Sequence, residues 1–501
     1  MFSPLANGWD MQAATGENDP EDSPEIHYQD ILNAARGVCD PRLAKILTLE
    51  AAERVQDLER LFGLSLVPGE SGKPRQVYGC FSSKNRAYQA AEPKVIKEKM
   101  AKSIGTFGIT LMENHMAVRL LVKENQCCGA VCLSRSGEYS ILYAGAVVLG
   151  AGGATGIFQH NFASGGMCGD GYLLALEAGC TLANMEFMQF GWGILAPKYK
   201  FLFLDRLLYL SPKFEFQMEH RFSWPLEEIL SDHAKHFPFS CCDKSYQADI
   251  AVFKETLGNG GRGVSVDISN IPLAKLEEIP VWHSWCQWFG EENNPYEHKM
   301  RITPFAHACN GGVVIDENAM TQVCGLFAAG EMAAGPHGAD RLGGNMHTAC
   351  QVFGARAGAG AARWARENPQ KPGKELSWEA LKTGGEKYKI SEMKEELGKL
   401  MWENANVARN DQSLAAALNK VTELKNALPD CCLKEQRWDY YECKSSLAVA
   451  EAILNGAFLR TESRGSHYRE DYPETEKKPY LLRTTLEGAR IKTVKGPVFG
   501  E

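Results

Sequence analysis

A glycine-rich stretch near residue 340 carries the residue types best suited to holding an organic anion. In "GLFAAGEMAAGPHGADRLGGNMHTACQVFGARAGAGAA" an apolar strand ends at Glu331, and the following loop holds His337, Arg341 and Asn345. Glycine lets backbone approach a ligand closely, and arginine can hold a carboxylate through two parallel hydrogen bonds. A small-residue helix follows as far as Ala362, and its first turn would offer free N–H groups to an anion. The pattern predicts that Glu331 and Arg341 are buried or line a pocket.

A histidine just upstream is a second candidate. His307 precedes two glycines and a strand in "TPFAHACNGGVVIDENAMTQVCG". A lone histidine is more often structural than a ligand. Its position in the sequence close to the Arg341 loop makes His307 a candidate.

Two earlier glycine segments leave alternatives open. In "VVLGAGGATGIF" a strand ends in Gly150, Gly152 and Gly153, which fits either close approach of a ligand or a tight strand–helix turn. In "ASGGMCGDGYLLALEAG" the residue Asp170 begins a helix. It could cap that helix or face a hydroxyl of a cofactor.

The elements that must position these residues alternate between helices and strands. Helical periodicity covers 28–64, and a second helix is expected over 87–104, starting or kinking at Pro93. We further predict strands over 115–124, 127–144 and 145–153, and helices over 169–183 and much of 380–460. The segment 461–501 is interpreted as a charged tail.

An aromatic, irregular stretch separates the glycine segments. Residues 191–303 have a texture that indicates an inserted second domain. Trp282, Trp285 and Trp288 recur at three-residue spacing, and we interpret them as a packed helical face instead of a cofactor site.

Composition excludes several classes of protein. The 501 residues carry a net charge of −8, which argues against a nucleic-acid-binding protein. The sixteen cysteines include no C-x-x-C motif, so a zinc or iron–sulfur site within the chain is not expected. No targeting segment is visible, and the uncharged stretch 141–158 fits a buried strand with a glycine turn better than a transmembrane segment. These features predict a cytoplasmic protein with reduced thiols.

Taken together, the segments resemble the flavoprotein family of succinate dehydrogenase, fumarate reductase and L-aspartate oxidase. The resemblance runs nearly the whole length of the chain, and "HGADRLGGN" is its most specific signal. The other matching segments are "EDSPEIHYQDILNAARGVCDPRLAKILTLEAAERVQDLERLFGL", "SGGMCGDGYLLALEAGCTLANMEFMQF", "AHACNGGVVIDENAMTQVCGLFAAGE" and "TESRGSHYREDYP".

The resemblance implies an α/β fold: a Rossmann-like FAD-binding domain, N-terminally truncated, with an inserted α+β capping domain and a C-terminal helical domain. The implied division is 1–190 and 305–362 for the FAD-binding domain, 191–304 for the capping domain and 363–501 for the C-terminal domain and tail.

The resemblance also implies the chemistry. His307 and Arg341 would hold a small carboxylate substrate for hydride transfer to or from the flavin. Electrons would leave to an iron–sulfur electron-transfer partner, to a quinone or to oxygen, and such a partner could place the protein at a membrane surface. The residues implied at the FAD are Gly152, Gly153, Asp170, Glu331, Asn345, Met346 and His347.

Four departures from the family pattern bear on function. The G-x-G-x-x-G unit is not found, which suggests a misassigned start, a true truncation or a second chain that completes the site. A family histidine that holds substrate falls on Gly191, and the proton-delivering arginine falls on Cys242 in "SCCD". The position of covalent flavin attachment in some members falls near Phe2, so any FAD would be noncovalent. A pocket that lacks two polar groups would hold one carboxylate instead of two.

Three functions therefore remain open. The first is an FAD-dependent oxidoreductase acting on a carboxylate. The second is a noncatalytic or degenerate flavoprotein-like subunit of an electron-transfer complex. The third is a thiol redox enzyme that uses Cys241–Cys242 or Cys127–Cys128, although adjacent cysteines form strained disulfides.

Overall fold

The two N-terminal helices pack against a small sheet. The computed structural model describes residues 10–69, 72–91, 96–279, 281–369, 378–385 and 387–500. Helices α1 (Pro24–Ala35) and α2 (Pro41–Phe62) divide the periodic region 28–64. Each begins with a proline behind a side-chain cap, Ser23 for α1 and Asp40 for α2, a favourable start for a helix.

The helix predicted over 87–104 is wrong in its first part. Residues Asn85–Gln89 form β3, which lies between β1 (Asp10–Gln12) and β2 (Gln76–Tyr78), and the helix α3 covers only Ile96–Thr106. Strand pairing with two neighbours overrides the local helical pattern. Pro93 lies outside the described residues.

Two parallel strands bring distant glycine segments to one edge. The antiparallel strands β4 (His115–Lys123), β5 (Gln126–Ser134) and β6 (Tyr139–Tyr143) confirm the prediction and lead into β7 (Val147–Leu149). Strand β7 pairs in parallel with β15 (Leu326–Ala328). Because parallel strands end at the same edge, the glycine turn after β7 meets the Glu331 turn after β15.

A five-stranded sheet uses the C-terminal segment that was expected to be a tail. Its order is β16-β14-β8-β19-β20. The bounds are β8 (Leu182–Ala183), β14 (Gly312–Val314), β16 (Ala333–Ala334), β19 (Leu481–Glu487) and β20 (Arg490–Gly496). The tail interpretation is therefore wrong for the β19–β20 hairpin. The helix predicted over 169–183 is also shorter: α4 (Asp170–Ala178) ends at Gly179, whose φ of +100° suits glycine.

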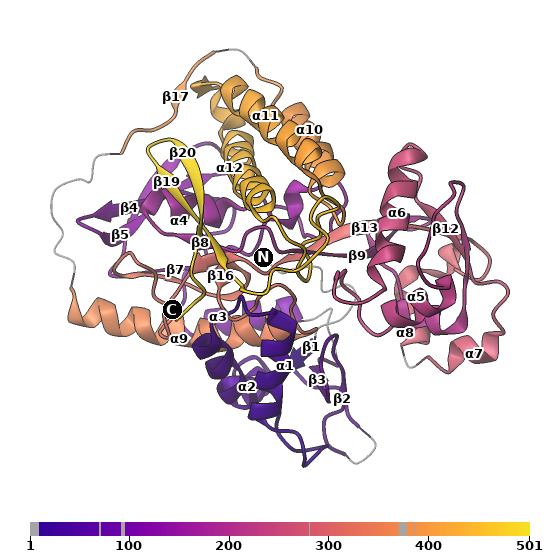
Figure 1. The fold of residues 1–501 in the computed structure, drawn as a ribbon. Coiled ribbons are helices and arrows are strands. Elements are labelled where there is room, and N and C mark those ends of the chain that lie inside the picture. Colours follow the sequence, from indigo (N-terminus) through magenta and orange to yellow (C-terminus); the bar gives the residue numbers. More distant parts are fainter. Residues whose placement is uncertain are drawn as a thin grey trace.

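Residues 192–302 contribute a second hydrophobic core, separate from the main one. Figure 1 shows it as a lobe joined to the main body by β9 (Met188–Ala196) and β13 (Met300–Cys309). The other elements of the lobe are β10 (Phe201–Leu202), β11 (Lys213–Glu215), β12 (Val264–Asp267), α5 (Leu226–His233), α6 (Tyr246–Gly258), α7 (Leu273–Glu277) and α8 (Trp282–Phe289). On α8, Trp282 and Trp285 are buried and stack at 5.8 Å between ring centroids, which confirms a packed helical face.

The remaining helices are one long helix against the parallel strands and a group of three above them (Figure 1). Helix α9 (Asn345–Glu367) runs past the predicted end at residue 362, and α10 (Ile390–Asn404), α11 (Asp411–Ala427) and α12 (Arg437–Leu459) lie together (Figure 1). The region 380–460 also contains two short strands, β17 (Lys382–Thr383) and β18 (Cys431–Cys432).

The described part of the chain contains no membrane-spanning helix, no disulfide and no cluster of metal ligands. None of its helices is long and apolar enough to cross a bilayer. All sixteen cysteines are free. No cluster of three or more His, Cys, Asp or Glu side chains suited to a metal ion occurs among the described residues.

Candidate functional site

Arg341 and His307 lie in one electrostatically connected cluster. Arg341 is 5% exposed, and its Nε donates to Oε1 of Gln189 at 3.0 Å while Nη1 donates to the carbonyl oxygen of Leu342 at 3.1 Å. Within the residues that the structure describes, Nη2 has no hydrogen-bond partner. Burial, with the charges of Arg341 and His347, lowers the pKa of His307 to about 3. The imidazole is therefore neutral and lies within electrostatic reach of the Arg341 guanidinium.

Aromatic rings fix the orientation of His307. The ring lies perpendicular to Phe237, at 5.1 Å between centroids, and to Phe162 at 6.1 Å. Its Nδ1 is buried and has no hydrogen-bond partner among the described residues. Neither Phe237 nor Gln189 was predicted from the sequence. Gln189 lies two residues before Gly191 on β9, so the alternation of side chains along that strand was the available signal.

Glu331 meets the first glycine turn, as the parallel strands require. A Cβ on Gly153 would overlap the Glu331 carboxylate, so only glycine fits there. Oε1 of Glu331 accepts a hydrogen bond from the backbone N–H of Cys309 at 2.9 Å. Burial raises the pKa of Glu331 to about 6. Tyr172 donates its hydroxyl to the Glu331 carbonyl at 2.9 Å, which holds the turn in place.

The start of α9 presents polar groups with no capping side chain. Gly344 occupies the N-cap position with φ +86° and makes no side-chain cap. Asn345 is buried; its Oδ1 pairs with Nε2 of His27 at 2.9 Å, and its Nδ2 has no partner in the part of the chain that the structure describes. Met346 and His347 are half-buried, and Nδ1 of His347 donates to the carbonyl oxygen of Asp10 at 2.9 Å.

These groups suit a flavin nucleotide. A Cβ on Gly150 would meet no atom within 4 Å, so open space lies beyond the end of β7, and Gly152 next to it has φ +77°. An uncapped helix start favours negative charge. Unpartnered Asn345 Nδ2 and His307 Nδ1 can bond to ring or substrate oxygens. The donor set therefore fits FAD.

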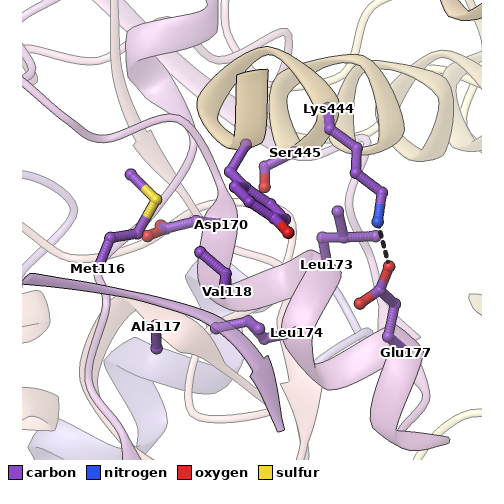
Figure 2. A pocket seen from close by; sticks show the side chains of 10 residues that line it. Met116, Ala117, Val118, Asp170, Leu173, Leu174, Glu177, Lys444 and Ser445 are labelled. Carbon is purple, nitrogen blue, oxygen red and sulfur yellow. Dashed lines mark hydrogen bonds and ion pairs between the residues drawn. The ribbon is translucent and has the colours of Figure 1, made fainter. Parts of the chain in front are cut away.

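Asp170 begins α4 next to the glycine turn after β7, since a Cβ on the following Gly171 would meet the Cβ of Ala151 and the Sδ of Met332. Figure 2 shows its side chain in a small pocket between β4, α4 and α12, together with Met116, Val118 and Leu173. The cavity has a volume of about 10 Å³, room for about one water molecule. Lys444 closes the far side by pairing with Glu177 at 2.7 Å (Figure 2). Burial raises the pKa of Asp170 to about 6.

Cys242 lies in a different environment from His307. It is exposed, and its charge interactions involve Arg36 and Asp340. The neighbouring Ser240 donates to Oδ2 of Asp340 at 2.8 Å. Contact with the Cys241 thiol, supported by the Arg36 charge, lowers the pKa of Cys242 to about 5. Phe2, the position implied for covalent flavin attachment, lies outside the described residues.

We expect Cys242 to be the most reactive thiol of the chain. Because the thiolate is the nucleophile, iodoacetamide at pH 6.5 should label Cys242 well before thiols whose pKa is raised by burial, such as Cys127 and Cys309. Peptide mass spectrometry after limited labelling measures the order, and Cys242→Ser should remove the fast phase. Equal labelling rates for Cys242 and Cys431, a half-buried cysteine of β18, would contradict the expectation.

Known proteins share both the sequence and the fold of this chain. Residues 3–200 and 251–346 match the family described as "FAD binding domain", and residues 394–496 match "Fumarate reductase flavoprotein C-term". One subunit of the fumarate reductase (CoM/CoB) of Methanothermobacter marburgensis is 29% identical over 493 residues, which cover 94% of this chain and 88% of that protein. An uncharacterised FAD-dependent oxidoreductase of Methanocaldococcus jannaschii is 30% identical over 495 residues, with the same coverages.

A solved structure agrees at the level of the fold. The structure described as Mycobacterium smegmatis Sdh1 in complex with UQ1 matches with a TM-score of 0.83 at 24% identity, covering 100% of this chain and 88% of that chain. The α/β fold implied by the resemblance is confirmed. The chain therefore belongs to the family of FAD-dependent oxidoreductases that contains fumarate reductase flavoproteins and L-aspartate oxidases, and FAD is its cofactor.

Proposed function

We propose that this protein transfers hydride between a noncovalently bound FAD and a small carboxylate substrate held by Arg341 and His307. One observation carries the proposal: a buried guanidinium acts electrostatically on a neutral imidazole, and its Nη2 has no hydrogen-bond partner within the described chain. A buried cation with spare donors is costly unless an anion binds to it. A carboxylate supplies that anion.

The residues proposed around the cofactor come from two chain segments, which meet at the edge where β7 and β15 end. Gly152 and Gly153 give close backbone approach, and Glu331 lies against Gly153. The start of α9, with Asn345, Met346 and His347, supplies N–H groups and a favourable dipole for negative charge. Bound FAD supplies the hydride chemistry, and the protein supplies orientation and charge. Asp170 is also part of this proposed set, because the start of α4 packs against Ala151 and Met332 beside the two turns.

Arg341 and His307 have different roles in the proposed site. The planar guanidinium can bind one carboxylate through two parallel hydrogen bonds. Gln189 fixes the angle of that guanidinium through Nε. His307 stays neutral at physiological pH, so it contributes a single N–H donor or an acceptor and adds no charge. Together they orient the acid and exclude water from it.

We also propose that the protein works with an iron–sulfur electron-transfer partner, on the cytoplasmic side and bound to the membrane only through that partner. Support comes from two relatives that are themselves parts of larger enzymes. The methanogen protein is one subunit of a fumarate reductase, and the Haemophilus influenzae relative is a fumarate reductase flavoprotein subunit. A quinone or oxygen is the alternative acceptor.

A noncatalytic subunit is the second candidate. The position Gly191 carries no polar side chain, and Cys242 interacts with Arg36 and Asp340 instead of with His307. A chain that binds FAD without binding a carboxylate would fit these two features.

One experiment separates the two candidates. The purified full-length chain is expected to show flavin absorbance near 450 nm, and acid precipitation is expected to release the flavin into the supernatant because no covalent bond holds it. After photoreduction under argon, unsaturated carboxylic acids are added one at a time, and flavin reoxidation is followed. Reoxidation by at least one acid supports the enzyme. A flavin-loaded chain that no acid reoxidises would point to the noncatalytic subunit, and a chain that cannot be loaded with FAD would overturn both candidates.

A further inference from the structure

A phenylalanine from the inserted lobe occupies the space beside Gly191. A Cβ at Gly191 would overlap the Phe237 ring, so a side chain at 191 and the observed Phe237 exclude each other. The backbone N–H of Phe237 donates to Sγ of Cys80 at 3.1 Å, which anchors the phenylalanine. Gly191 also pairs directly with Phe305 across β9 and β13. The space that a side chain at position 191 of β9 would occupy is therefore filled by the Phe237 ring.

Three phenylalanines form an apolar wall on one side of His307. Phe237 and Phe162 both present perpendicular contacts to the imidazole, at 5.1 and 6.1 Å between centroids. Phe162 stacks on Phe305 at 5.0 Å with an interplanar angle of 26°. Phe162 and Phe305 are fully buried, and Phe237 is half-buried. No charged side chain belongs to this wall.

Among the described residues, Arg341 is the permanent cation whose charge acts on His307. Arg341 and His347 are the residues whose charges reach His307. Burial lowers the pKa of His347 to about 4, so this imidazole is neutral at physiological pH. The same holds for His337, whose pKa is lowered to about 3 by burial and the Arg341 charge. One carboxylate satisfies Arg341, and a second carboxylate would face phenyl rings without a donor, at a large desolvation cost.

We infer that the substrate is an acid with a single carboxylate and an apolar alkyl or aryl chain, and that the pair Gly191 and Phe237 sets this preference. The inference rests on the proposed function, because it takes Arg341 and His307 as the carboxylate site. The chain of the acid lies against Phe237, the half-buried ring of the wall, where aromatic contact and burial of apolar surface stabilise it. A dicarboxylate of the same length is rejected by the same wall.

Equilibrium binding tests the preference without turnover. The FAD-loaded, full-length protein is titrated with 3-phenylpropanoate and with succinate, and the dissociation constants are measured by flavin absorbance change and by calorimetry. We expect 3-phenylpropanoate to bind at least about tenfold more tightly, a ratio that a hydrophobic pocket readily reaches. The double variant Gly191→His/Phe237→Ala replaces the ring by an imidazole and should reverse the preference. Phe216→Ala, which removes a ring elsewhere in the lobe, should leave the ratio unchanged.

A second experiment, which measures reoxidation of the reduced flavin, distinguishes failure of this inference from failure of the proposed function. Photoreduced protein is mixed with cinnamate or with fumarate; cinnamate gains a hydride and a proton to become 3-phenylpropanoate as the flavin is oxidised. If fumarate reoxidises the flavin faster and succinate binds more tightly, the proposed function stands and the inference is overturned. If none of the four acids binds or reacts, the proposed function fails and the inference fails with it. An unchanged ratio in a folded, FAD-loaded double variant removes the role of Gly191 and Phe237.

Discussion

Arg341→Lys is expected to lower kcat/KM for the carboxylate substrate by about a hundredfold. Lysine keeps the positive charge but loses the planar fork that can bind both carboxylate oxygens. It also loses the hydrogen bond from Nε to Gln189, which fixes the angle of the guanidinium. Loss of one partner of a buried, charged hydrogen-bonded pair costs about 2–5 kcal/mol, and about 1.4 kcal/mol corresponds to a tenfold change in rate.

Arg341→Lys should weaken binding and turnover of the substrate and leave binding of the flavin unchanged. Steady-state kinetics with the acid that reoxidises the flavin fastest gives kcat and KM, while absorbance gives flavin content. Flavin content should stay near that of the unchanged protein, because the proposed cofactor contacts come from the glycine turn after β7 and the start of α9. Arg363→Lys is the matched control. Arg363 is exposed on α9, the helix that follows the Arg341 loop, and this change should leave kcat/KM unchanged. An Arg341→Lys protein with normal kcat/KM and normal flavin content would remove the arginine from the carboxylate site.

The loop that holds Arg341 could be predicted because the residues that identify it are close together in the sequence. A strand that ends in glycines, followed by Arg341 and a small-residue helix, already implies backbone close to a ligand. The meeting of Gly153 and Glu331 follows from one further rule, that parallel strands end at one edge of a sheet. Both features depend on residues close to one another in sequence or on a simple sheet topology.

Features that depend on tertiary contact escaped the sequence analysis. Phe237 comes from the loop after α5 and reaches Gly191 on β9, and the sequence spacing of these two residues says nothing about their contact. The prediction of a helix over 87–104 was wrong at β3, because the apolar pattern of the sequence does not show that Arg86 is buried. In the fold, Arg86 is fully buried and pairs with Asp22 at 2.8 Å and Asp30 at 2.6 Å.

The segment "TESRGSHYREDYP" illustrates the same limit. Its charges suggested a solvated tail, but most of them are buried and paired with one another. Arg469 donates to the carbonyl oxygens of Ala457 and Phe458 and so closes the end of α12. Charge composition alone cannot distinguish a solvated run from an internal network, since the difference lies in which partners the fold provides.

The core of that network leads to the second large effect. Arg460, Glu186 and Glu462 are each fully buried. Arg460 bridges the two carboxylates, with Nη2 at 2.7 Å from Glu186 and Nη1 at 2.6 Å from Glu462. Glu462 also pairs with Arg464 at 2.8 Å. The guanidinium of Arg460 lies 4.5 Å from the centroid of the Tyr480 ring. The network joins α12 to the segment that leads into β19.

Arg460→Met is therefore expected to destabilise the fold by about 3–5 kcal/mol at pH 7.5, because it leaves two buried carboxylates without their shared cation. The guanidinium chloride midpoint, followed by tryptophan fluorescence, measures the loss. Lys492→Met removes one partner of the exposed pair with Glu487 and should cost at most about 1 kcal/mol. Equal losses from the two variants would contradict a structural role for the buried network.

The cost of Arg460→Met should shrink as pH falls. Although burial opposes it, pairing with Arg464 and Arg460 holds the pKa of Glu462 below its ordinary value. A carboxyl group whose folded pKa is lowered stabilises the fold above its unfolded pKa, and that stability is lost as pH falls through the folded pKa. Without Arg460 less of this stabilisation exists to be lost, so the variant and the unchanged protein should converge as the pH is lowered from 5 to 3, through and below the ordinary glutamate pKa of 4.5. A gap between the two midpoints that stays constant over this range would show that the loss comes from packing and not from the paired charges.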